Sequence, residues 1–114
     1  MTEDDFLHAV IELAQWNGWM AFHPRPAQYQ NGRWATHYSG DRGFPDLVLA
    51  HPERGVIFAE LKTAKGRATP HQAAWLFTLE LAGQEATIWT PADMPAIKKR
   101  LGGKPHDSSE PETR

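Results

Sequence analysis

The chain of 114 residues contains no cysteine, which excludes disulfides, thiolate metal sites and cysteine nucleophiles and fits a reducing cytosol. No apolar run approaches the roughly 18 residues that a membrane span needs. The first residues, Met1-Thr2-Glu3-Asp4-Asp5, are too acidic for a signal peptide. An excess of basic residues is also missing, because the net charge is −2 at pH 7. This balance argues against a non-specific nucleic-acid coat protein and predicts one soluble, cytoplasmic domain.

The charge is unevenly distributed along the chain. Residues 21–67 hold seven basic and four acidic residues, whereas the N-terminal segment and the tail carry much of the negative charge. If two of these acids bind a metal, the rest of the segment is clearly positive. The candidate phosphate contacts in it are Arg25, Arg33, Arg42, Lys65 and Arg67, with a solvated basic loop as the alternative for Lys65 and Arg67.

Hydrophobic periodicity and capping residues predict the order of secondary-structure elements. The order is a helix over 3–17, a strand over 19–23, a long irregular loop over 24–43, a hairpin of strands 45–50 and 56–62, a helix over 69–82, a strand over 85–90 and a helix over 92–101. Residues 102–114 are rich in Gly, Pro, Ser and charge, and we expect a disordered tail there. The prediction is an α/β sandwich with a mixed central sheet of about four strands flanked by helices.

The hairpin brings three charged residues of an otherwise apolar stretch together. With the turn centred near Glu53, opposite residues have numbers that sum to about 106, so Asp46 faces Glu60. Their Cβ atoms would lie ~5 Å apart. Lys62 follows Glu60 by two residues and points to the same face.

Two carboxylates this close repel each other unless a cation lies between them. Mg²⁺ or Mn²⁺ is the expected ion, because hard cations are often held by one or two carboxylates plus water. Glu3 falls near the centre of the apolar face of the first helix and is the expected third acid. It could bind the metal directly or through a water molecule. Glu12 is the other choice, but its position about opposite makes it less suitable. Lys62 would orient the attacking water and offset charge on a phosphate.

The pattern Pro45-Asp46 followed by Glu60-Leu61-Lys62 resembles the PD-(D/E)xK nuclease superfamily. The longer strings "GWMAFH", "GFPDLVLA", "FAELKTAKGRATPHQ" and "LELAGQEATIWTP" resemble one branch of it, the small VRR-NUC domains. The similarity extends over residues 3–101, so we expect a restriction-endonuclease-like nuclease domain over 1–101.

The resemblance implies a metal-dependent endonuclease that cleaves DNA, often at branches or flaps. Stand-alone members of phages and bacteria resemble Holliday-junction resolvases, with roles in DNA repair, and tend to be homodimers, which implies the cytoplasm of a bacterium or phage-infected host. The motif residues carry over as Asp46, Glu60 and Lys62, with Gln72 as a further site position and Glu3 as the helix acid. The carbonyl of Leu61 is a further candidate metal ligand. Cleavage of flaps or duplex, RNA as substrate, and a non-catalytic DNA-binding module are the alternatives.

Simpler explanations remain open for several residues. Glu60 and Lys62 could form a surface ion pair, and Asp46 could bond within a turn. Glu3 could favour the dipole of its helix, and Gln72 could serve only in a capping box with Thr69. The six histidines are scattered and show no tight zinc-ligand spacing, and His23, at the end of a strand, could approach the site. Trp75 and Trp89 are expected in the core, whereas Tyr29, Trp34 and Tyr38 either cover the core or stack on bases.

Overall fold

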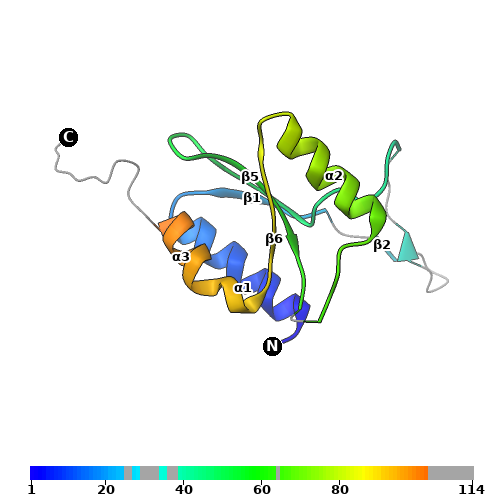
Figure 1. Ribbon diagram of the computed structural model, residues 1–114. Helices are drawn as coiled ribbons and strands as arrows, with labels where there is room; N and C mark the ends of the chain where they lie inside the picture. Colours follow the sequence, from blue (N-terminus) through cyan, green and yellow to red (C-terminus); the bar gives the residue numbers. More distant parts are fainter. Residues whose placement is uncertain (25–26, 29–33, 36–38, 64, 103–114) are drawn as a thin grey trace.

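A computed structural model describes residues 1–24, 27–28, 34–35, 39–63 and 65–102 (Figure 1). The elements appear in the predicted order, with two short additional strands and a 3-10 turn. The α/β class expected from the sequence is confirmed. The elements are α1 (Glu3–Trp16), β1 (Met20–Phe22), β2 (Ala27–Gln28), β3 (Trp34–Ala35), β4 (Leu47–His51), β5 (Gly55–Leu61), α2 (Pro70–Leu81), β6 (Glu85–Trp89), η1 (Pro91–Asp93) and α3 (Met94–Gly102).

The central sheet has four strands in the order β1-β4-β5-β6. The first two pairings are antiparallel, and β5 pairs with β6 in parallel after the chain passes through α2. In the β4–β5 hairpin, Leu47 pairs with Ala59 and Val48 with Phe58. This is the register that the position of the turn predicted. Continued by one residue beyond the pair Leu47–Ala59, it brings Asp46 toward Glu60.

Helices cover both faces of this sheet, as the apolar character of β4 and β5 on both sides requires. Helices α1 and α3 lie side by side on one face, and α2 lies on the other (Figure 1). The main core forms on the first face. It includes Phe6 and Val10 of α1, Leu49 of β4, Ile57 of β5 and Ile97 of α3, all of which are fully buried.

Local capping residues set where the two long helices begin. The Oγ1 of Thr2 accepts a hydrogen bond from the N–H of Asp5, and the Asp5 carboxylate accepts from the N–H of Thr2. Thr69 and Gln72 exchange the equivalent pair of bonds at the start of α2. The capping box of Thr69 and Gln72 was predicted from the sequence, and both caps satisfy helix N–H groups that lack partners.

The structure corrects two expectations. The segment 24–43 is not wholly irregular, because β2 and β3 pair within it as a separate two-stranded sheet. Trp75 is only half-buried, whereas Trp89 lies in the core as expected. The predicted tail beyond Gly102 lies outside the described residues, as do Tyr29 and Tyr38. Within the described part of the chain, no helix combines the length and the apolar character needed to cross a membrane.

Candidate active site

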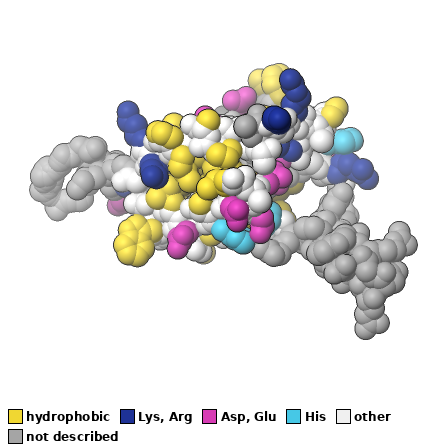
Figure 2. All heavy atoms as spheres, turned by 90° about the horizontal axis from the view of Figure 1, so that it is seen from below, with side chains coloured by type: hydrophobic (Ala, Val, Ile, Leu, Met, Phe, Trp, Pro, Cys, Tyr) yellow, Lys and Arg dark blue, Asp and Glu magenta, His cyan; other side chains and the backbone are white. Residues whose placement is uncertain are grey.

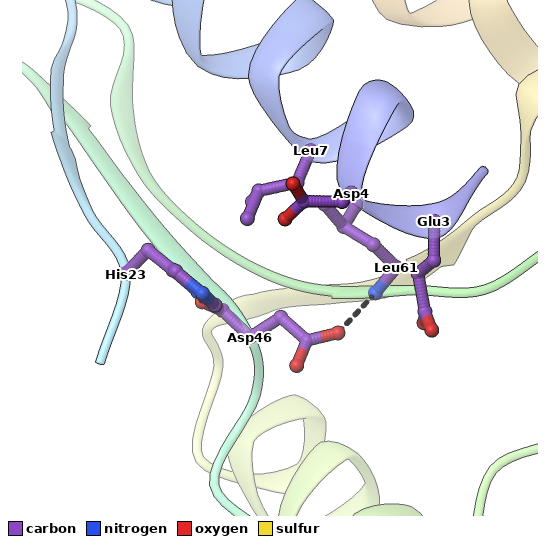
Figure 3. A pocket seen from close by; sticks show the side chains of 6 residues that line it. All are labelled: Glu3, Asp4, Leu7, His23, Asp46 and Leu61. Atoms are coloured by element: carbon purple, nitrogen blue, oxygen red, sulfur yellow. Dashed lines mark hydrogen bonds between the residues drawn. The ribbon is translucent and has the colours of Figure 1, made fainter. Parts of the chain in front are cut away.

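Asp46 precedes β4 by one residue and is held by two neighbouring strands. Its Oδ2 accepts a 2.9 Å hydrogen bond from the main-chain N–H of Leu61 in β5 (Figure 3). Its main-chain oxygen lies 2.6 Å from Nδ1 of His23, just after β1. Because a carbonyl oxygen can only accept, this contact places the hydrogen of the histidine on Nδ1. The carboxylate therefore has a fixed position at the end of the sheet.

Glu60 is the buried charged residue of the site, with 1% of its surface exposed. Its Oε2 lies 3.3 Å from Nζ of Lys62, whose side chain is 14% exposed. Its Oε1 is buried and has no hydrogen-bond partner among the described residues. Burial first, and then the negative charge of Asp46, raises the pKa of Glu60 to about 7, although Lys62 acts in the opposite direction.

A pocket of about 340 Å³ opens beside Asp46, between the first turn of α1 and the end of the sheet. Its lining residues, all labelled in Figure 3, are Glu3, Asp4, Leu7, His23, Asp46 and Leu61. Glu3 therefore lies at the site, whereas Glu12 does not line this pocket. Glu3 lies four residues before the buried Leu7 and lines the pocket with it, and its side chain is exposed because it belongs to the first helical turn.

The donor set of this site can be compared with the needs of a divalent cation. Among the described residues, no three His, Asp or Glu side chains converge closely enough to hold a metal ion. Two carboxylates, Asp46 and Glu60, remain, and Mg²⁺ or Mn²⁺ accepts such a set when water fills the other positions. The unpartnered Oε1 of Glu60 fits this chemistry, because a buried carboxylate oxygen is costly unless something pairs with it. Direct ligation by Glu3 or by the Leu61 carbonyl stays a prediction.

Basic residues lie near this site on the loop that follows β5. Lys65 and Arg67 are exposed there, and Arg42 is exposed on the loop before β4. Gly66 comes close to Lys62, since a Cβ at this position would lie 3.3 Å from Cβ and Cδ of that lysine. Gly66 therefore packs against the Lys62 side chain, and Lys65 and Arg67 flank this glycine in the sequence. Arg25 and Arg33 lie outside the described residues.

Gln72 makes its observed side-chain hydrogen bond in the cap of α2. The capping box therefore accounts for this residue, and a role in the chemistry stays a prediction. Asp4 is a pocket residue that the sequence analysis did not single out. Its neighbour Glu3 and its spacing of three residues from Leu7 were the available signals, since positions three apart share a helix face.

The surface near the N-terminal helix has an uneven charge pattern. On the face shown in Figure 2, acidic and histidine side chains lie together, whereas Lys and Arg side chains lie toward the margins. In α1, Nδ1 of His8 lies 3.9 Å from an Asp4 carboxylate oxygen, and both side chains are largely exposed. A polyanion would meet repulsion at these carboxylates unless a cation were bound among them.

Comparisons with known proteins find a similar fold among solved structures. No protein-family model and no curated protein sequence matches the chain. Among solved structures, one titled "VRR_NUC domain protein" is 20% identical, with a TM-score of 0.55 over 90% of this chain and 89% of that chain. Another, titled "VRR_NUC domain", is 21% identical, with a TM-score of 0.58 over 95% of this chain and 100% of that chain. The chain thus has the restriction-endonuclease-like VRR-NUC fold, and the resemblance drawn from the motifs is confirmed at the level of the fold.

Proposed function

We propose that this chain, whose fold is that of VRR-NUC domains, is a metal-dependent endonuclease that hydrolyses DNA phosphodiester bonds. The observation that carries the proposal is the grouping of Asp46, Glu60 and Lys62 at the end of one hairpin. Glu60 is buried there, has a raised pKa, and has one carboxylate oxygen without a partner in the described part of the chain. A purely structural ion pair would not need the second carboxylate beside it, so the arrangement favours a site built for a cation.

Asp46 and Glu60 would hold Mg²⁺ or Mn²⁺, with the Leu61 carbonyl as a further donor and Glu3 acting through water. When bound, the cation supplies a Lewis acid for the scissile phosphate and lowers the pKa of a water molecule. The N–H of Leu61 keeps one Asp46 oxygen in place. Lys62 positions the attacking water and offsets the negative charge that grows on the phosphate.

The exposed cations around the site would hold the DNA backbone. Lys65 and Arg67 follow the site along the chain, and Arg42 lies just before it. Arg25 and Arg33 complete the set that the sequence suggested. Because such contacts release counterions, binding should weaken steeply as salt concentration rises. Removal of one of these charges should weaken binding to all DNA substrates to a similar extent.

Four-way junctions are the proposed substrate, in agreement with the resolvase-like resemblance of the motifs. One site cuts one strand, and resolution of a junction needs two cuts. We therefore propose a two-fold homodimer, with one active site for each of the two strands. Two results together would contradict this part of the proposal. One is a monomeric mass at micromolar concentration in light scattering, and the other is unpaired cuts in junctions.

The decisive experiment is cleavage of end-labelled junction, flap, linear duplex and single-stranded DNA with Mg²⁺, Mn²⁺ or EDTA. The variant Asp46→Asn removes a proposed ligand, and Glu53→Gln, in the exposed β4–β5 turn, is the matched control. Paired symmetrical cuts in the junction that need metal and Asp46 would support a dimeric resolvase. Cleavage of flaps or duplex alone would keep the site chemistry and discard the junction role. Binding without cleavage would favour a non-catalytic DNA-binding module.

A further inference from the structure

A second and larger pocket lies beside Asp46. It has a volume of about 690 Å³. Helix α2 contributes Trp75 to it, and the strand β1 contributes Phe22. Asp46 lines this pocket as well as the one beneath α1, so the two pockets meet at the same residue. Whatever occupies the second pocket therefore lies directly next to the proposed reaction site.

Three aromatic side chains, Phe22, Phe44 and Trp75, line this pocket. The rings of Phe44 and Trp75 meet edge to face, with centroids 5.0 Å apart and an interplanar angle of 85°. Phe44 also meets Phe58 edge to face at 6.1 Å. Phe44 is nevertheless 37% exposed, and Phe22 is 62% exposed. The pocket therefore presents aromatic surface that the core does not use.

The wall of the pocket is anchored to α2. The indole N–H of Trp75 donates a 3.3 Å hydrogen bond to the main-chain oxygen of Asp41. Gly43 lies so close to α2 that a Cβ there would be 2.6 Å from a main-chain atom of His71. These contacts fix the segment that carries Phe44 in the absence of a ligand. A ring held in this way loses little conformational freedom when it stacks on a partner.

Polar groups accompany the rings. Ser39, Asp41 and Arg42 line the same pocket. A hydroxyl, a carboxylate and a guanidinium can pair with the hydrogen-bonding edge of a nucleobase, and Arg42 also offers a positive charge to the adjoining phosphate. Aromatic faces next to such groups are typical of sites that take unpaired bases.

We propose that this pocket binds an unpaired nucleobase of the DNA strand that is cut, an inference that rests on the proposed function. The base of a nucleotide is separated from its phosphate only by the sugar. A phosphate beside Asp46 can therefore have its own base, or that of its neighbour, in the aromatic pocket. A base in a continuous duplex is stacked between its neighbours and must first leave the stack, whereas an unpaired base does not. The substrate class is thus DNA with an unpaired nucleotide beside the cut, as at a flap base or an opened branch point.

The test compares DNA with a single unpaired nucleotide against the same DNA with an abasic residue at that position. Binding is measured by fluorescence anisotropy in Ca²⁺, so that the readout does not depend on cleavage. We expect wild type to bind the abasic DNA about tenfold more weakly, because stacking of one base on an aromatic side chain contributes about this factor to the affinity. Phe22→Ala should lose about the same factor on the base-containing DNA and nothing further on the abasic DNA.

Matched variants separate stacking from general damage. Phe77→Ala removes a phenylalanine of similar exposure, 63%, which does not line this pocket, and should bind both DNAs as wild type does. Phe22→Tyr keeps the ring and should retain the affinity, whereas Phe22→Leu keeps only apolar surface and should lose it.

Equal binding of the two DNAs by wild type, or an equal loss on both DNAs in Phe22→Ala, would overturn the inference. Its failure is distinguishable from that of the proposed function. Metal-dependent cleavage that ignores the base would leave the nuclease intact without a base pocket. Base-dependent binding with no cleavage in Mg²⁺ or Mn²⁺ would keep the pocket and remove the nuclease.

Discussion

Nζ of Lys62 lies 3.3 Å from Oε2 of Glu60, a carboxylate of which only 1% is exposed. This contact leaves the other carboxylate oxygen, Oε1, without a partner among the described residues. Burial, and then the negative charge of Asp46, raises the pKa of Glu60 to about 7, and Lys62 offsets this rise only in part. A buried acid that one lysine does not fully neutralise can also pair with a cation.

The change Lys62→Ala should lower the cleavage rate at saturating DNA by about 10²-fold or more, because positioned charge acts mainly on the transition state. DNA affinity should change little, since the lysine side chain is 14% exposed and contributes little to the outer surface. Single-turnover kinetics measure the rate, and anisotropy in Ca²⁺ measures the affinity. Lys98→Ala, an exposed lysine on α3, is the matched control. Parallel losses of rate and affinity in Lys62→Ala would show that the residue only binds DNA.

Without metal, the free energy of unfolding should fall as pH rises from about 4.5 through about 7. Glu60 keeps its proton in the folded state until about pH 7, whereas in the unfolded chain it loses the proton near the ordinary pKa of 4.5. The stabilising contribution is therefore complete below 4.5 and lost above 7. Glu60→Gln lacks this ionisation and should be more stable than wild type at pH 8, by up to about 3 kcal/mol.

Urea unfolding in EDTA at a series of pH values from 4.5 to 8.5 measures this difference. Glu53→Gln, in the exposed turn, should follow the wild-type curve and serves as the control. A difference between wild type and Glu60→Gln that stays constant across the series would mean that Glu60 ionises normally.

Mg²⁺ affinity should depend on pH through the same carboxylate. Protons compete with the metal wherever Glu60 is protonated, so affinity should rise about tenfold per pH unit below 7 and level off above it. Isothermal titration calorimetry at four pH values from 5.5 to 8.5 gives the slope, and Glu60→Gln should remove it. A wild-type slope that continues unchanged above pH 8 would assign the competing proton to another group.

Gly43→Ala should destabilise the fold by at least about 3 kcal/mol, because it combines an unfavourable backbone angle with a steric overlap. Gly43 has φ of +94° and little room, since an added Cβ would lie 2.6 Å from the backbone of His71. Gly40→Ala is the matched control, because Gly40 has φ of +100° and no atom of the described residues lies within 4 Å of an added Cβ. The control should lose only about 1 kcal/mol. Thermal denaturation of both variants measures the difference, and equal losses would mean that α2 and this loop adjust to one another.

Much of the fold could be read from the sequence because the relevant signals are local. The caps of α1 and α2 depend on residues three positions apart, and the predicted capping box of Thr69 and Gln72 is present. The register of β4 and β5 follows from the position of their turn, because each residue pairs at a fixed distance from it. That register is sufficient to bring Asp46 toward Glu60, because both residues lie within the same hairpin.

The sequence by itself therefore determined the α/β class, the hairpin and the grouping of Asp46, Glu60 and Lys62. Only the tertiary structure decided that Glu3 is exposed, that Asp4 and His23 line the site, and that β2 pairs with β3. It alone also joined Phe22, Phe44 and Trp75 around one pocket. The physical reason is that caps and hairpins depend on hydrogen bonds between chain neighbours. A pocket depends on how a helix, a loop and a strand edge distant in the sequence pack together, which no local pattern encodes.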